Sequence, residues 1–198
     1  EYINYWYGGK QTLLCTKLAQ YYVKRNYKIF KELDIDIEGS YLDVFGVVAI
    51  RECAHKEHMM TRRESAEYRI KCLEILDGQG IITSSEEPCD FILPSMALVH
   101  HAPFAVEEIG SYESEAIGIP IPLFNLVYHD CVVIPWMGLE GGGWNLPKDD
   151  WGLLHALLNG DTIYYDICEK SGNIELGKVA LDLHEKVCLE EMVKHEFL

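Results

Sequence analysis

Basic residues are scarce in this chain of 198 residues, which has 17 lysines and arginines, 32 aspartates and glutamates and a formal net charge of −15. Nucleic-acid binding needs a basic face, so this balance argues against a nucleic-acid partner. It also disfavours an anionic membrane surface. Neutral or cationic small molecules, including sugars, stay open as ligands. Hydrophobic residues make up 48% of the chain, which excludes intrinsic disorder and suits one domain with a substantial core.

Long apolar runs are missing as well. The longest nearly uncharged stretch, residues 116–130, is interrupted by two prolines and a histidine, whereas a spanning helix needs about 20 apolar residues. The chain opens on Glu1-Tyr2-Ile3-Asn4, without the basic and apolar segments of a signal peptide. We therefore expect no membrane partner and a cytoplasmic location. Because an initiating methionine is also missing, we expect both ends to be cuts through a larger protein.

Cysteine pairs of the Cys-x-x-Cys type are absent. The seven cysteines stand alone at positions 15, 53, 72, 89, 131, 168 and 188. An odd number without such pairs indicates neither a disulfide framework nor a structural zinc site. We expect reduced core cysteines, with a catalytic thiol at Cys131 as the less favoured alternative.

Phosphate-binding and nucleophile-elbow motifs are absent too. The chain has no Gly-x-Gly-x-x-Gly, phosphate loop or Gly-x-Ser-x-Gly, and Gly141-Gly142-Gly143 lacks the Lys-Ser/Thr that phosphate binding requires. We therefore expect no cofactor and no bound metal.

Apolar periodicity predicts alternating helices and strands. Thr61, with Glu64 three residues later, has the spacing of a capping box. Apolar runs without polar alternation indicate buried parallel strands, so the predicted fold is α/β with a helix-covered parallel sheet. The expected helices are 12–33, 61–80, 150–158 and 175–188, and the expected strands or extended segments are 41–45, 81–83, 120–128, 131–136 and 162–167.

Two carboxylates fall where such sheets place their functional groups, at the carboxyl ends of strands. Asp43 interrupts the apolar strand 41–45, where an unpaired buried carboxylate would be costly; an ion pair with an arginine is the structural alternative. Glu86 follows the next strand, and a shift of one residue would exchange it with Glu87. Two converging carboxylates are what glycoside hydrolysis needs, one to stabilise or attack the anomeric carbon and one to protonate the leaving oxygen.

Further polar and aromatic residues are candidates for substrate contact. His129 and Asp130 could hydrogen-bond to sugar hydroxyls, although a structural pair is an equal alternative. Trp136, Trp144 and Trp151 surround the glycine loop and could stack on sugar rings, although a tryptophan is more often a core residue. Tyr41 is expected to contact the substrate beside Asp43.

A metal-dependent hydrolase is the rival interpretation. His55, His58, His129 and Asp130 are possible ligands, although His-x-x-His is a weak signal without carboxylate or cysteine support.

Four sequence stretches resemble a glycoside hydrolase barrel, most similar to family 129 and the related family 101, which are α-N-acetylgalactosaminidases. They are Gly39–Phe45, Thr61-Arg62, Gly80–Glu86 and Pro122–Asp130, within a match over roughly residues 12 to 198. The resemblance implies a retaining mechanism with an Asp nucleophile and a Glu acid/base, which fall on Asp43 and Glu86.

A (β/α)8 barrel needs about 250 residues, so the resemblance implies only its later half. We expect residues 1–190 to be the C-terminal part of a catalytic barrel, without its N-terminal half, and 191–198 to begin the junction to a following β-domain. The expected function is hydrolysis of α-linked N-acetylgalactosamine or a related sugar. A catalytically incomplete carbohydrate-binding fragment is the other alternative.

Overall fold

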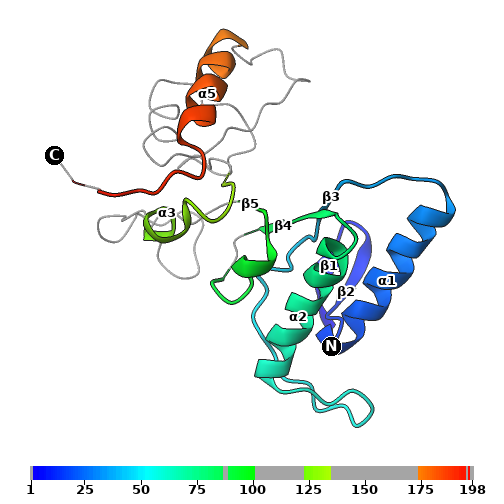
Figure 1. Ribbon diagram of the computed structural model, residues 1–198. Coiled ribbons are helices and arrows are strands. Elements are labelled where there is room, and N and C mark those ends of the chain that lie inside the picture. The colour runs from blue at the N-terminus through cyan, green and yellow to red at the C-terminus, as the bar shows by residue number, and fades with distance from the viewer. Residues whose placement is uncertain (1, 87–88, 101–122, 135–173, 195, 197–198) are drawn as a thin grey trace. The chain divides into compact units, whose positions relative to one another are not determined.

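The computed structural model describes residues 2–86, 89–100, 123–134, 174–194 and 196 (Figure 1). The chain divides into two compact units. Unit 1 comprises Glu1–Ser84 and Cys89–Met96, and unit 2 comprises Ser85–Pro88 and Ala97–Leu198. Across the described ranges, no helix has the length and apolar character needed to cross a membrane.

Unit 1 contains a hairpin, two long helices and parallel strands. The hairpin pairs β1 with β2 in antiparallel fashion, and Gly9 at its turn has φ 108°, a left-handed conformation that glycine adopts without steric cost. The elements in chain order are β1 Tyr2–Trp6, β2 Gly9–Thr12, α1 Thr16–Glu32, β3 Gly39–Tyr41, α2 Arg62–Asp77, β4 Ile82–Glu86 and the 3₁₀ turn η1 Leu93–Ser95. The last two residues of β4, Ser85 and Glu86, belong to unit 2.

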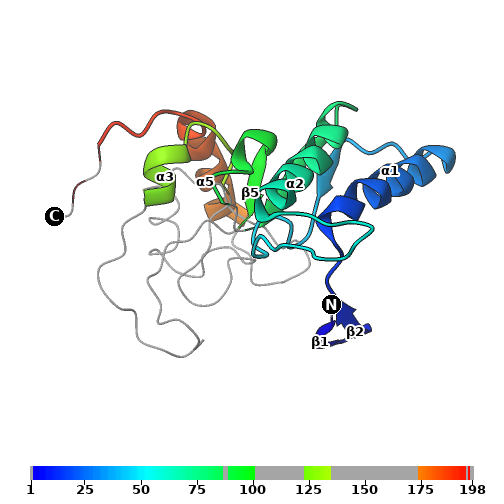
Figure 2. The same cartoon turned by 90° about the horizontal axis from the view of Figure 1, so that it is seen from below.

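Helix α2 begins where the sequence predicts. The Thr61 hydroxyl accepts from the Glu64 amide at 3.2 Å, and the Glu64 carboxylate accepts from the Thr61 amide at 2.8 Å. This capping box is confirmed. The two long helices lie side by side in both views (Figures 1 and 2). Between them, a core of Ala19, Val23, Cys72, Leu76 and Ile81 is buried.

The strands of the main sheet are parallel where their register is established. Gly39 aligns with Ile82, Ser40 with Thr83 and Tyr41 with Ser84, and the sheet order is β3-β4-β5. Strand β5, Leu98–His100, is not among the elements that the sequence predicts. The Val99 amide donates to the Val133 carbonyl at 2.9 Å, and Leu98 and Val133 form a parallel bridge. The α/β class with parallel strands is confirmed.

Unit 2 contains two helices among its described residues, α3 Leu123–Tyr128 and α5 Ile174–Val187. The prediction for α5 is confirmed to within one residue at each end. The predicted extended segment 120–128 is wrong over its described part, because residues 123–128 are helical and the ring centroids of Phe124 and Tyr128, four residues apart, are 5.1 Å apart. Residues 120–122 lie outside the described residues. The predicted elements at 150–158 and 162–167 lie outside the described residues.

Candidate functional site

Asp43 lies in a turn, exposed, and not within a buried strand. Strand β3 ends at Tyr41, and the Leu42 amide still donates to the Ser84 carbonyl at 2.9 Å before the chain turns away. Val44 has φ 52°, a conformation that a β-branched residue rarely adopts and that costs about 1–3 kcal/mol. The predicted buried strand 41–45 is therefore wrong: the turn lets the carboxylate keep its contact with water, so it has no burial penalty to offset.

Arg69 holds the chain that follows this turn. Its side chain projects from α2 and is only 4% exposed. The guanidinium donates to the carbonyls of Phe45 at 3.2 Å and Ala49 at 3.0 Å, and to that of Val48. One planar fork therefore ties three backbone oxygens of residues 45–49 to α2. Burial lowers the pKa of Arg69, and the group stays charged because its ordinary pKa is so high.

Strand β4 carries hydroxyl side chains up to Glu86. Thr83 Oγ1 donates to the Ser95 carbonyl at 2.7 Å and Ser84 Oγ to the Ser40 carbonyl at 3.2 Å, while Ser85 is completely buried. The sequence predicts that this strand ends at residue 83, whereas in the structure it continues through these residues. Glu86 is its last residue and is half-buried, and Glu87 lies outside the described residues.

His129 and Asp130 follow helix α3 and differ in burial. His129 is 6% exposed, and its Nδ1 lies 2.6 Å from the Glu190 carbonyl oxygen, so this nitrogen carries the proton and donates it. Asp130 is exposed and accepts from Cys131 Sγ at 3.2 Å. That bond raises the pKa of the Cys131 thiol, which disfavours a thiolate there. The prediction that Cys131 is a core residue is wrong, since it is exposed.

The other predicted substrate contacts are described only in part. Tyr41, at the end of β3, is 38% exposed. Trp136, Trp144 and Trp151 lie outside the described residues. Of the four proposed metal ligands, His55 and His58 belong to unit 1, and His129 and Asp130 to unit 2.

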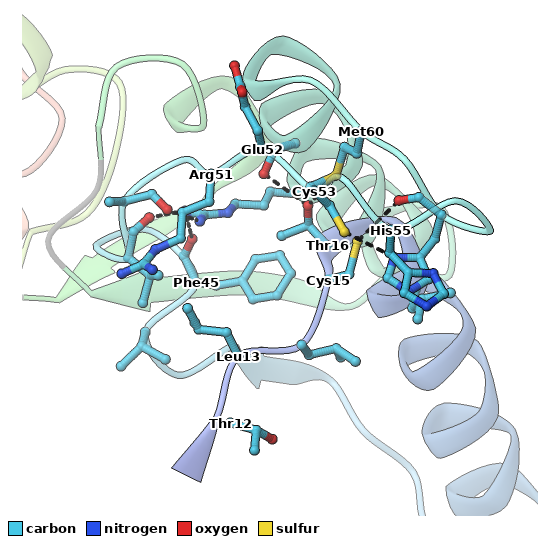
Figure 3. A pocket seen from close by; sticks show the side chains of 18 of the residues that line it. Thr12, Leu13, Cys15, Thr16, Phe45, Arg51, Glu52, Cys53, His55 and Met60 are labelled. Carbon is cyan, nitrogen blue, oxygen red and sulfur yellow. Dashed lines mark hydrogen bonds between the residues drawn. The ribbon is translucent and has the colours of Figure 1, made fainter. Parts of the chain in front are cut away.

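Unit 1 contains a pocket of about 860 Å³ (Figure 3), and its lining includes Val44 and Phe45, which follow Asp43 in the turn. Val44, Phe45 and Arg69 contribute to its wall, and so do three side chains with soft metal-ligand atoms. These three are Cys15, Cys53 and His58, whose ligand atoms all lie within 4.8 Å of one another. Burial raises the pKa of the Cys15 thiol, and the neighbouring Cys53 contributes to the rise.

The sequence indicates His58 as a possible ligand but not its grouping with Cys15 and Cys53, because these residues are far apart along the chain. Cys15 precedes α1, and Cys53 and His58 lie on a loop before α2. The presence of cysteine and histidine, which are metal-binding residue types, is the sequence signal for this group, because their spacings match no short metal-binding motif.

No protein-family model matches the chain, and no curated protein matches it. Solved structures of α-N-acetylgalactosaminidase NagBb from Bifidobacterium bifidum do match. The quadruple mutant is 41% identical with a TM-score of 0.84, the ligand-free form 42% with 0.82, and the complex with GalNAc 39% with 0.80. Each match covers 99–100% of this chain and 32% of the other.

The chain thus spans about a third of the length of the structures it matches. Those structures are of a glycoside hydrolase, and the similarity runs through both units without a break in coverage. The resemblance that the sequence motifs indicate is therefore confirmed: this chain is similar, over its whole length, to an α-N-acetylgalactosaminidase of glycoside hydrolase family 129.

Proposed function

We propose that this chain supplies both catalytic carboxylates of a retaining glycoside hydrolase that acts on α-linked N-acetylgalactosamine. The identity of 39–42% to an α-N-acetylgalactosaminidase, one of whose structures is a GalNAc complex, supports the reaction and the sugar. Asp43 is the proposed nucleophile and Glu86 the proposed acid/base. Residues 1–190 form the later part of the catalytic barrel in this proposal, and 191–198 begin the junction to a further domain.

The register of the parallel strands is the observation that carries the residue assignment. Tyr41 of β3 aligns with Ser84 of β4. Asp43 comes two residues after Tyr41, and Glu86 comes two residues after Ser84. Glu86 is the last residue of β4, and Asp43 lies in the turn that follows the end of β3. Each carboxylate therefore stands at or just after the carboxyl end of a parallel strand, the position typical of active sites in barrel enzymes.

The local environments suit two different roles. Asp43 is exposed on a turn, so its carboxylate is accessible to an anomeric carbon. Its oxygen forms the bond to that carbon as the glycosidic bond breaks, and Glu86 gives its proton to the leaving oxygen. Glu86 then takes a proton from water, which attacks the glycosyl–Asp43 ester, releases the sugar with retained configuration and restores both side chains.

Substitution of the two carboxylates in the full-length protein tests the proposal. We expect Asp43→Asn to bind sugar but to lose turnover. Glu86→Gln should impair substrates with poor leaving groups most, because an activated aryl group leaves without a proton. Asp36→Asn and Glu38→Gln are matched controls, since both carboxylates are exposed and precede β3.

Azide distinguishes the two roles. It should rescue Asp43→Gly to give an inverted glycosyl azide, because the anion takes the place of the missing nucleophile. It should rescue Glu86→Ala to give a retained one, because it attacks the intact glycosyl-enzyme. Parental rates for both variants on aryl and natural α-GalNAc substrates would exclude both residues from catalysis.

The spacing of the carboxyl groups in a crystal structure of the complete enzyme gives a second test. A retaining enzyme requires about 5–5.5 Å, whereas about 6.5–9.5 Å would make the enzyme inverting.

A carbohydrate-binding part without catalysis is the second candidate, because the chain covers only 32% of the enzyme it resembles. Equilibrium binding of GalNAc by the chain, combined with no turnover of an aryl α-GalNAc substrate, would favour it. Turnover restored by adding the missing upstream segment would favour the enzyme.

A further inference from the structure

Three soft metal ligands meet in unit 1, although they come from two separate parts of the chain. Cys15 is the residue just before α1, and Cys53 and His58 belong to one loop. Cys53 Sγ lies 3.2 Å from His58 Nδ1, and Cys15 Sγ lies 3.8 Å from the His58 carbonyl oxygen. The sulfur atoms of Cys15 and Cys53 lie next to one another at one end of the pocket (Figure 3).

The loop that carries two of the ligands is closed by its own backbone. Cys53 and Met60 exchange both hydrogen bonds of an antiparallel bridge, at 2.8 and 2.9 Å. Inside the loop the His58 amide donates to the His55 carbonyl at 3.1 Å, and the two imidazoles stack with centroids 4.2 Å apart. The position of His58 relative to Cys53 is therefore fixed before any ion binds.

Helix α1 fixes the third ligand relative to this loop. Thr16 Oγ1 donates to Met60 Sδ at 3.0 Å and also shares a hydrogen bond of 2.9 Å with the Ser65 hydroxyl. Lys17 Nζ donates to the Met59 carbonyl at 3.3 Å. Cys15, directly before these residues, is thus held against the loop. Ligands on pre-formed elements are what a metal site requires, because little ordering is left for the ion to impose.

The spacing of the ligand atoms suits a tetrahedral ion. With Zn–S bonds of about 2.3 Å and Zn–N bonds of about 2.0–2.1 Å, two thiolates are about 3.8 Å apart and a thiolate and an imidazole about 3.5 Å. Cys53 Sγ and His58 Nδ1 lie 3.2 Å apart, close to the thiolate–imidazole value, and all three ligand atoms lie within 4.8 Å of one another. Side-chain shifts of less than about 1 Å would complete the site.

The donor set also selects the ion. Two thiolates and one imidazole are soft and borderline ligands, which favour Zn²⁺ over the oxygen-seeking Ca²⁺ and Mg²⁺. Two thiolates neutralise the two charges of Zn²⁺, so the half-buried site would carry no net charge. We propose that Cys15, Cys53 and His58 bind one zinc ion, with water in the fourth position on the side of the pocket, and that the ion fastens loop 53–60 to the start of α1.

Metal replacement tests this proposal directly. The chain is purified with a reductant, stripped with a chelator and titrated with Zn²⁺ or Co²⁺. We expect one zinc ion per chain, and for the cobalt form an intense thiolate-to-cobalt charge-transfer band together with the visible bands of tetrahedral Co²⁺. Zinc should raise the unfolding midpoint of the parent chain, because it binds the folded state.

Variants identify the ligands. Cys15→Ser and Cys53→Ser should each lower zinc affinity by about 100-fold or more, since even groups behind a ligand are worth about 10- to 100-fold. Cys89→Ser is the matched control, because Cys89 is exposed, lies in the same unit and is outside the cluster. It should keep the zinc stoichiometry, the cobalt spectrum and the zinc-dependent midpoint of the parent.

His58→Gln keeps the result interpretable if a cysteine variant fails to fold, because it leaves both thiols in place. It should bind zinc about 100-fold more weakly or worse while its secondary structure, measured by circular dichroism, stays that of the parent. Three results would overturn the proposal. They are zinc content well below one per reduced parent chain, unchanged zinc binding in the ligand variants, or a Cys15–Cys53 disulfide that persists under reductant and leaves no thiols to bind metal.

Discussion

Replacing Arg69 by methionine should release the backbone that follows Asp43 and destabilise unit 1. The guanidinium is 4% exposed and donates to three carbonyls of residues 45–49. Methionine fills a similar volume but donates no hydrogen bond, so all three oxygens lose their partner. Arg69→Lys should recover only part of the loss, because a single ammonium cannot reproduce a planar fork that reaches three acceptors.

The size of the effect follows from the three hydrogen bonds. Each is worth about 1 kcal/mol net, so the sum is about 3 kcal/mol. Phe45 and Val48 are half-buried, so water can replace some of these bonds. The smallest expected loss of unfolding free energy is therefore about 2 kcal/mol. For a chain of 150–250 residues, each kcal/mol moves the thermal midpoint by about 2–4 °C, so about 3 kcal/mol corresponds to about 6–12 °C.

Urea unfolding followed by circular dichroism measures this loss against a matched control on the same helix. Arg63 is also an α2 arginine, but its side chain is 89% exposed and only pairs with Glu67 four residues on. Arg63→Met should therefore cost about 0.3–0.5 kcal/mol. Equal losses for Arg69→Met and Arg63→Met would refute the reasoning, because burial and the three carbonyl bonds would then contribute nothing.

Two further predictions concern a helix start and a histidine. Thr61→Ala removes the hydroxyl of the capping box and should cost about 1 kcal/mol in urea unfolding, whereas Thr61→Ser keeps an acceptor and should cost much less; equal losses would contradict the cap. Burial, and then the nearby His129, lower the pKa of His184, with Glu185 opposing the shift. The unfolded chain therefore binds more protons below about pH 6.5, so stability should fall as pH falls from about 7 towards 5, and His184→Gln should flatten that part of the curve; an unchanged slope would contradict it.

The sequence predicts the long helices well because their signals are local. The capping box at Thr61 and the apolar spacing within α1 and α2 each depend on residues a few positions apart, and the structure confirms both helices. The predicted start of the first helix at residue 12 is wrong, because Thr12 ends strand β2 and α1 begins at Thr16. A short element contains too few residues to carry several such local signals. The six residues of α3 are as apolar as a strand, and only the spacing of Phe124 and Tyr128 indicates a helix.

The candidate site was predictable where it depends on strand order and not where it depends on tertiary contacts. The parallel pairing of β3 and β4 follows from the alternation of helices and apolar runs. The exposure of Asp43 does not follow from the sequence pattern. It depends on a turn with φ 52° at Val44, which the run Leu-Asp-Val-Phe does not indicate. Cys15 and Cys53 are likewise brought together by the packing of α1 on the loop before α2, which no local pattern encodes.

The segment between Asp43 and α2 is held by contacts outside itself. Arg69 ties residues 45–49 to α2, and hydrogen bonds from Thr16 and Lys17 tie the end of the 53–60 loop to α1. The strained backbone at Val44, which costs about 1–3 kcal/mol, persists because such contacts over-determine its surroundings. A strand that simply continued past Tyr41 would need none of this support. The two long helices therefore determine where the proposed nucleophile leaves the sheet, and substitutions on them should affect turnover without touching the sugar.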